Sequence, residues 1–212
     1  MYGVTFGTKH SYGDYGLVMT DYDTENPAPR RNLVSVPGRN GLLDVTGALT
    51  PVITYDNRQL QFAFKWKSSP ETYEDELQEI TNDLHGKTMH VILDSDPDYY
   101  YDGFVTVESH DFSGREEATL VVAVDAYPYK FRTEETVKTK SGSGTLVCPN
   151  DRMEVIPTIQ VTANTSITFG TDTYSLSAGS HKVAGIQFVK GDNELTISGS
   201  GTTTVKYRQG RL

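Results

Sequence analysis

The clearest periodic pattern in the chain lies between residues 68 and 94. Apolar residues recur there at spacings of four, three and four positions, so four side chains share one face of a helix: Tyr73, Leu77, Ile80 and Leu84. Pro70 suits a first helical position, and Gly86 suits the left-handed conformation that ends many helices. We predict a helix over residues 70–85, capped by Ser68 or Ser69, with these four side chains as its core face.

Strict alternation of apolar and polar residues predicts a strand at residues 59–67 (QLQFAFKWK). Weaker strand patterns occupy residues 3–7, 16–20, 31–37, 88–93, 99–108 and 116–126, and the glycine- and tyrosine-rich residues 10–16 predict a turn. Strands joined by short turns favour antiparallel pairing. We therefore predict a mainly β protein whose N-terminal domain is an antiparallel β-sandwich or barrel-like sheet with one packed α-helix.

The character of the sequence changes after residue 133. Residues 134–144 are charged and then rich in serine and glycine, which is the composition of a linker or a hairpin tip. Beyond them, short threonine- and valine-rich strands alternate with turns. We predict an N-terminal domain over residues 1–133, a linker over 134–144 and a small all-β C-terminal sandwich over 145–212.

Charge is divided unevenly between these parts. The formal net charge is -9, but residues 1–135 hold 11 basic against 23 acidic residues, whereas residues 136–212 hold 8 against 5. Tight binding to nucleic acid needs clustered lysine and arginine. The acidic N-terminal half therefore argues against nucleic acid as an adhesive ligand, while it allows DNA to pass nearby.

The sequence gives no sign of membrane insertion or secretion. No apolar run approaches the length of a membrane span, and Met1–His10 lacks the basic start and apolar core of a signal peptide. Cys148 is the single cysteine, which excludes an internal disulfide and a multi-cysteine zinc site. We expect a chain made in a cytoplasm, with no membrane partner and a buried thiol at Cys148.

Catalytic signatures are missing from the sequence. Asp94, Asp96 and Asp98 alternate as in a calcium loop, but the sixth and twelfth positions are Tyr99 and Val105 instead of glycine and an acid. The five histidines form no HExxH pair, and no GxSxG or SxxK motif is present. We expect no enzyme, no metal and no cofactor, although a carboxylate pair of a hydrolase stays open because acidic residues are abundant.

Aromatic residues give candidates for a protein interface. Tyr99, Tyr100 and Tyr101 are consecutive, so at least one must point outward from a strand, and an outward tyrosine suits an interface. Trp66 shares the face of Phe62 and Phe64 and is a core or interface residue. We take Trp66 and the three tyrosines as candidate subunit-interface residues.

Several short motifs follow one another along the chain: YGL at 15–17, PGRNGLLDVTG at 37–47, NRQLQFAF at 57–64, LHGK at 84–87, YYYDGFV at 99–105 and the PYKF that ends the first domain. Together they resemble the distal tail protein (Dit) family of siphophages and related prophages of Gram-positive bacteria. The family-like positions are Gly38, Gly41, Asp44, Leu84, His85, Gly86, Lys87, Gly103, Pro128 and Tyr129. Their order covers most of residues 1–132, and the C-terminal part is similar to the β-sandwich of such proteins.

The resemblance implies a structural virion component at the tail tip, assembled in the bacterial host cytoplasm. N-terminal domains would form a homohexameric ring around the DNA channel, between the tail tube protein and the tail-associated (Tal) protein of the baseplate. C-terminal domains would project outward, in some members as docking points for receptor-binding proteins. The alternative, from a different class, is a carbohydrate-binding adhesin that acts through the C-terminal β-sandwich in host recognition.

Overall fold

A computed structural model describes residues 3–49, 52–114 and 116–212. Met1 and Tyr2, at the start of the segment that lacks signal-peptide features, lie outside the described residues. The chain divides into two compact units, Met1–Pro128 and Tyr129–Leu212. The division falls within the PYKF motif, and each unit is described by itself below.

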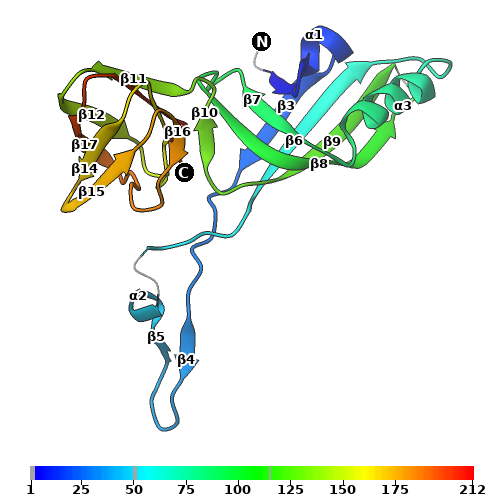
Figure 1. Ribbon diagram of the computed structural model, residues 1–212. Coiled ribbons are helices and arrows are strands. Elements are labelled where there is room, and N and C mark those ends of the chain that lie inside the picture. The colour runs from blue at the N-terminus through cyan, green and yellow to red at the C-terminus, as the bar shows by residue number, and fades with distance from the viewer. Residues whose placement is uncertain (1–2, 50–51, 115) are drawn as a thin grey trace. The chain divides into compact units, whose positions relative to one another are not determined.

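One antiparallel sheet forms most of the first unit (Figure 1). Strand β6 (Arg58–Lys67) shows the alternation that its sequence predicts, with every second side chain buried. It pairs with β9 along its whole length. The strand order is β2-β1-β7-β8-β9-β6-β3. The other strands are β1 (Val4–Phe6), β2 (Lys9–His10), β3 (Val18–Thr24), β7 (Lys87–Leu93), β8 (Tyr99–Phe112) and β9 (Glu117–Ala126).

The sheet curls onto itself, which confirms the barrel-like prediction. In the strand order, β1 and β6 are separated by three other strands. Nevertheless the ring of Phe6 on β1 lies 5.8 Å from Phe62 and 6.3 Å from Phe64, both on β6. Only a strongly bent sheet brings these rings together, and they are three of the largest side chains in one continuous core.

Helix α3 (Tyr73–Leu84) covers part of this core, and its buried residues are the four that the spacing predicts. Tyr73 stacks between Trp66, at 5.9 Å, and Phe112, at 4.9 Å. The predicted start is wrong, because Ser69 begins a turn whose carbonyl accepts from the N–H groups of Thr72 and Tyr73. Thr72 is the N-cap, and neither predicted serine caps the helix.

The predicted turn at residues 10–16 contains a short helix, α1 (Ser11–Tyr15). The N–H groups of Tyr12 and Gly13 donate to the His10 ring. The carbonyls of Ser11 and Tyr12 accept from the N–H groups of Leu17 and Gly16, which close the helix. Gly16 has a φ of 68°, which only glycine adopts easily. The sequence pattern missed α1 because five residues are too few to show a helical period.

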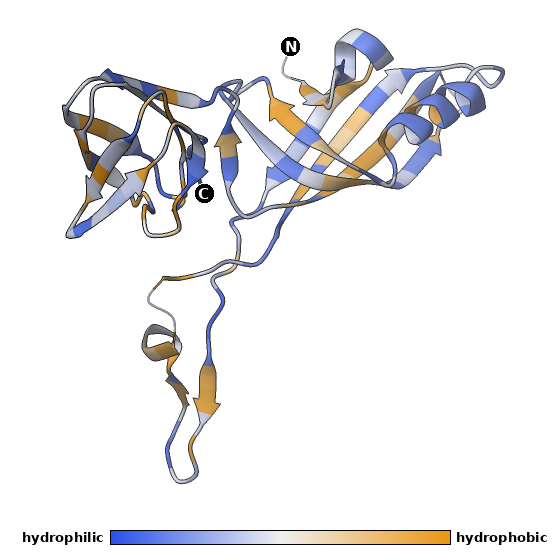
Figure 2. Cartoon of the chain, viewed as in Figure 1, coloured by the Kyte–Doolittle hydropathy of each residue, from blue (hydrophilic) through white to orange (hydrophobic). Residues whose placement is uncertain are grey.

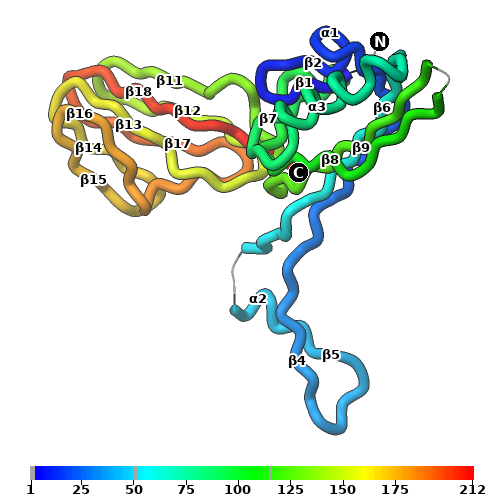
Figure 3. Tube along the Cα trace, turned by 90° about the vertical axis from the view of Figure 1, so that its right-hand side faces the viewer, coloured from blue at the N-terminus to red at the C-terminus, as the bar shows by residue number. Residues whose placement is uncertain are grey.

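A hairpin interrupts the chain between β3 and β6. It consists of β4 (Leu33–Ser35), β5 (Leu42–Asp44) and the single-turn helix α2 (Thr46–Leu49). We call the segment that contains it, residues 26–49 and 52–57, the arm. Its two legs are the segment that leaves β3 and the segment that returns to β6. Figure 3 shows them side by side.

The second unit is the predicted small β-sandwich. One sheet has the strand order β11-β18-β13-β16 and the other β12-β17-β14-β15, and a core rich in isoleucine and leucine includes Phe188 and Tyr207. Lys130–Arg132 (β10) pairs with Gly210–Arg211 (β19). The sandwich strands are β11 (Thr136–Ser141), β12 (Gly144–Asn150), β13 (Thr158–Val161), β14 (Thr165–Phe169), β15 (Asp172–Leu176), β16 (Gly179–Lys182), β17 (Gly191–Ser198) and β18 (Thr202–Tyr207).

The linker predicted at 134–144 is wrong. Residues 136–141 form β11, which pairs with β18 from Thr136 to Ser141, and Gly142 turns the chain into β12 with a φ of 69°. The serine and glycine content therefore marks the tip of a hairpin, the other structure that such a composition serves. Cys148 lies buried in the sandwich core, and burial raises the pKa of its thiol to about 11. No described helix is long and apolar enough to cross a bilayer.

Candidate functional site

The arm is the most unusual surface of the first unit. Every residue from Ala28 to Leu42 is exposed, although several are apolar. Leu42, Leu49 and Ile53 have 57%, 66% and 54% of their surface exposed, and no arm residue belongs to the core. Figure 2 shows the apolar colour of β4. Several large apolar side chains exposed on one segment are a feature of interaction sites.

The motif PGRNGLLDVTG builds the end of the arm. Gly38 and Gly41 lie within the β4–β5 connection with φ values of 79° and 76°, which explains why glycine stands at both family-like positions. Asp44 holds the turn of chain that follows. Its carboxylate accepts from the Thr46 N–H at 3.0 Å and from the Arg31 guanidinium at 2.8 Å. Hydrogen bonds from Thr46, followed by the bond from Arg31, lower the pKa of Asp44 to about 2.

Backbone hydrogen bonds, and not a core, hold the two legs of the arm together. The Arg30 N–H donates to the Thr54 carbonyl, and the Asp56 N–H donates to the Ala28 carbonyl. The Arg30 guanidinium also lies 2.6 Å from the Asp56 carboxylate. An isolated two-stranded hairpin is only marginally stable in water. A partner that covers its apolar side chains would therefore stabilise the arm.

Arg58 fixes the root of the arm to the sheet. It is buried, donates from Nε to the Glu25 carbonyl at 3.0 Å, and lies 5.3 Å over the Tyr101 ring. Burial lowers the pKa of the Arg58 guanidinium. Its Nη1 has no hydrogen-bond partner among the residues that the structure describes. Glu25 precedes the arm and Arg58 follows it, so this hydrogen bond holds the two ends of the arm together where they meet β3 and β6.

A groove of about 1050 Å³ lies between α1, α3 and the β3–β6 edge of the sheet. Its walls carry acids, aromatic rings and lysines: Tyr12, Asp14, Lys65, Trp66, Glu76 and Glu79. Glu76 accepts from the Trp66 indole at 2.9 Å and from the Ser68 hydroxyl at 2.6 Å. Burial acts to raise the pKa of Glu76, but the hydrogen bonds from Ser68, Trp66 and Thr72 outweigh it and lower the pKa.

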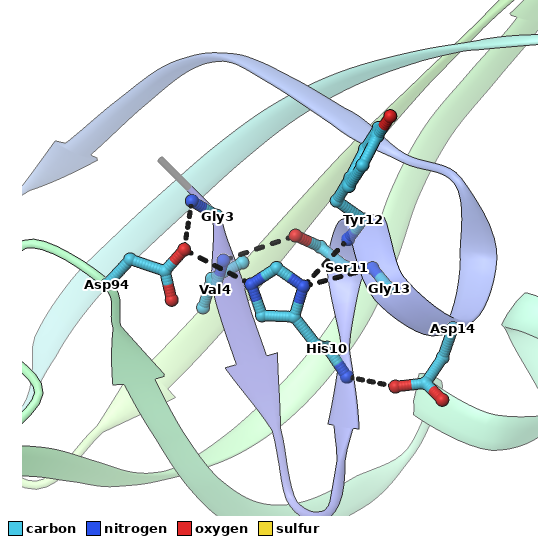
Figure 4. Close-up of polar contacts among 8 residues, drawn as sticks. All are labelled: Gly3, Val4, His10, Ser11, Tyr12, Gly13, Asp14 and Asp94. Atoms are coloured by element: carbon cyan, nitrogen blue, oxygen red, sulfur yellow. Dashed lines mark hydrogen bonds and ion pairs between the residues drawn. The ribbon is translucent and has the colours of Figure 1, made fainter. Parts of the chain in front are cut away.

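A polar cluster holds α1 at the rim of this groove (Figure 4). The His10 Nδ1 accepts from the N–H groups of Tyr12, at 3.2 Å, and Gly13, at 3.0 Å. The other ring nitrogen therefore carries the proton, which it donates to Asp94 at 3.2 Å. Asp94 also accepts from the Gly3 N–H at 2.8 Å. A Cβ at Gly3 would lie 2.6 Å from the His10 ring, so only glycine fits there.

A second contact joins α1 and β2 to the last turn of α3. Lys9 Nζ lies 2.5 Å from the Asp83 carboxylate, which also accepts from the Tyr15 hydroxyl at 3.0 Å. These two hydrogen bonds, that of Lys9 first, lower the pKa of Asp83. Burial, followed by the hydrogen bond to Asp83, raises the pKa of Tyr15. These contacts to Asp83 therefore join α1 and α3, which form two walls of the groove.

Three of the remaining family-like positions shape the sheet or its connection to α3. His85 Nδ1 accepts from the Val107 N–H at 3.1 Å, and Gly86, with a φ of 76°, turns the chain from α3 into β7. A Cβ at Gly103 would lie 2.6 Å from Val124 and 2.8 Å from the Ala126 Cα, so glycine permits close pairing of β8 and β9. Lys87 begins β7 beside the buried end of α3, and Pro128 and Tyr129 stand at the division between the units.

The aromatic residues proposed for a subunit interface lie mostly inside the chain. Trp66 and Tyr101 belong to the core of the first unit, and Tyr99 is also buried. Strand alternation is the reason, because Tyr99 and Tyr101 share one face of β8. Tyr100 is half-buried, and its ring lies 4.1 Å from that of His90. An interface role stays a prediction for Tyr100, whereas burial argues against it for the other three.

The acidic turn after β7 has a structural use. Asp94 binds Gly3 and His10, and the Asp96 N–H donates to the Leu93 carbonyl. Among the described residues, no three histidine, cysteine or acidic side chains gather closely enough to hold a metal ion. Sequence reasoning missed the groove and the exposure of the arm, because both depend on which surfaces the fold leaves uncovered.

No protein-family model matches this chain, and no curated protein sequence matches it. Among solved structures it is similar to the crystal structure of the SPP1 Dit (gp 19.1) protein, a paradigm of the hub adsorption apparatus in Gram-positive infecting phages. The TM-score is 0.70, the sequence identity is 12%, and the alignment covers 100% of both chains. The chain therefore has a Dit-like fold over its whole length.

Proposed function

We propose that this chain is a structural component of a phage tail, a distal tail protein without catalytic activity. The observation that carries the proposal is the full-length Dit-like fold, which includes both units and leaves no part of either chain unmatched. SPP1 Dit belongs to a hub adsorption apparatus. The same role here accounts for a chain that is built of antiparallel sheets and exposes an apolar arm.

In this role, six copies form a ring at the tail tip. The ring joins the tail tube protein to the tail-associated protein and surrounds the channel through which DNA passes without specific binding. The sandwich units offer outward docking points for receptor-binding proteins. The arm supports self-assembly, since its apolar side chains have no core of their own to enter. Covering them against another copy removes that surface from water.

Immunogold labelling of phage particles tests the proposed location. An antibody raised against the full chain is applied to particles released by the bacterium whose genome carries this sequence. Gold at the distal tip of the tail is the expected result, and antibody absorbed beforehand with purified chain is the control. Label confined to the capsid, spread along the tail shaft or missing from intact particles would contradict the proposal.

A further inference from the structure

The groove beside α1 and α3 and the arm have complementary charge. Among the residues that the structure describes, the groove is lined by five acids, Asp14, Glu76, Glu79, Glu116 and Glu117, against Lys65 and Lys67. Lys65 is already paired with Glu117 at 2.7 Å. The groove therefore has a surplus of negative charge.

The arm has the opposite surplus at its tip. Residues 30–49 contain three arginines and one acid. Arg30 pairs with Asp56 and Arg31 with Asp44, whereas Arg39 in the β4–β5 turn has no ion pair within the described part of the chain. Next to this free cation lie exposed apolar side chains such as Leu33 and Leu42. The tip thus presents an apolar surface together with one uncompensated positive charge.

We propose that the arm of one copy docks in the groove of a second copy. Leu42 packs against the exposed ring of Tyr12, and Arg39 faces Glu79, an exposed acid of the α3 wall. A groove of this volume accepts several side chains. Attraction between the charges guides the arm into the groove, and apolar burial supplies most of the binding free energy.

The occupant is another copy because of the symmetry that a ring requires. Arm and groove are two different surfaces, so their contact is heterologous and repeats head to tail until the circle closes. Contact between two arms would be isologous and would stop at a dimer. This inference rests on the proposed ring, and the experiment below separates the failure of one from the failure of the other.

Disulfide trapping between two differently tagged full-length chains tests the docking. One chain carries Tyr12→Cys and the other Leu42→Cys, both at exposed positions, and the native Cys148 is buried in each. Mixed and oxidised, they should form the tagged heterodimer in several-fold higher yield than a matched pair in which Tyr22→Cys replaces Tyr12→Cys. Tyr22 is a similarly exposed tyrosine of the same unit that does not line the groove.

A heterodimer yield at the control level overturns the docking, even where the wild-type chain forms rings. Dominant pairing of Leu42→Cys with itself also overturns it, because the arms would then contact each other. A strong heterodimer from a chain that never closes into a ring supports the docking and contradicts the ring.

Charge reversal gives an independent measurement on the same contact. Arg39→Glu and Glu79→Lys should each lower the trapping yield several-fold, and the mixture of chains that combines both reversals should restore it. Glu74→Lys makes the same charge change on α3 outside the groove and should leave the yield unchanged. Equal loss with Glu79→Lys and Glu74→Lys would contradict a specific contact.

Discussion

At single residues, the fold depends on positions where an added methyl group would clash or where the loss of one hydrogen bond would separate two elements. Gly103 and Gly3 allow close approach of other groups, and Asp83 joins two elements far apart in the sequence. The family-like positions Gly38, Gly41, Gly86 and Gly103 thus have physical causes: three need a positive φ and one needs space. A short motif that identifies little by its sequence alone is thus explained by the turn or strand pair that needs its glycine.

We predict that Gly103→Ala destabilises the first unit. The added methyl would meet Val124 at 2.6 Å and the Ala126 backbone at 2.8 Å, and overpacking of this kind costs about 1–3 kcal/mol. Urea unfolding followed by tryptophan fluorescence measures the change, since Trp66 lies in the same core. Gly47→Ala is the control, because a Cβ there meets nothing within 4 Å. Equal stability of the two variants would show that close packing at Gly103 does not limit the stability of the first unit.

Asp83 should make stability depend on pH. Its pKa in the folded chain is lowered, so its contribution to stability is present at pH values above about 4 and is lost as the pH falls through the folded-state value. Asp83→Asn should lower Tm at pH 7 and should weaken the fall in Tm between neutral pH and pH 3. Thermal unfolding of both proteins across that range measures the difference. Parallel Tm profiles would show that the bonds to Lys9 and Tyr15 contribute nothing.

At the scale of elements, α3 illustrates what the sequence can predict. The spacing of its apolar residues identified the buried face, because a helix places positions three and four apart on one side. The start failed, because serine and proline at 68–70 serve equally in a turn. Local chemistry therefore predicted the face of the helix better than its first residue.

Leu77→Ala should cost about 2–5 kcal/mol of unfolding free energy, because Leu77 lies buried between α3 and the sheet. Chemical denaturation monitored by circular dichroism gives the value. Gln78→Ala changes the next residue, on the exposed face, and should cost little. A loss below 1 kcal/mol for Leu77→Ala would show that α3 contributes little to the core.

The arm shows why part of the candidate site was beyond prediction. The pattern of RNLVSVP predicts a strand, and this segment does contain β4. The pattern cannot state whether the core belongs to the same chain or to another. Trp66, Tyr99 and Tyr101 show the reverse case, because these aromatic residues, which would also suit an interface, are buried inside the chain.

At the scale of the whole molecule, charge composition leads to a prediction about the channel. Residues 1–135 carry 23 acids against 11 bases, and the proposed ring of six copies would multiply that excess. We predict that the lumen is net negative and that assembled rings do not retain duplex DNA in a gel-shift assay at low salt, because like charges repel. Retention of DNA, or a basic lumen in a reconstruction of the ring, would contradict this prediction.

We propose that the arm joins copies of this chain into a closed ring, and mass photometry of the full chain over a wide concentration range measures that assembly. Six copies of the 23.5 kDa chain give a particle of 141 kDa. We predict that particle for the wild type and for Val137→Asp, an exposed apolar position in the second unit, and only the single chain for Leu42→Asp. A wild-type chain of 23.5 kDa at every concentration, or a Leu42→Asp variant that assembles as the wild type does, would contradict the claim.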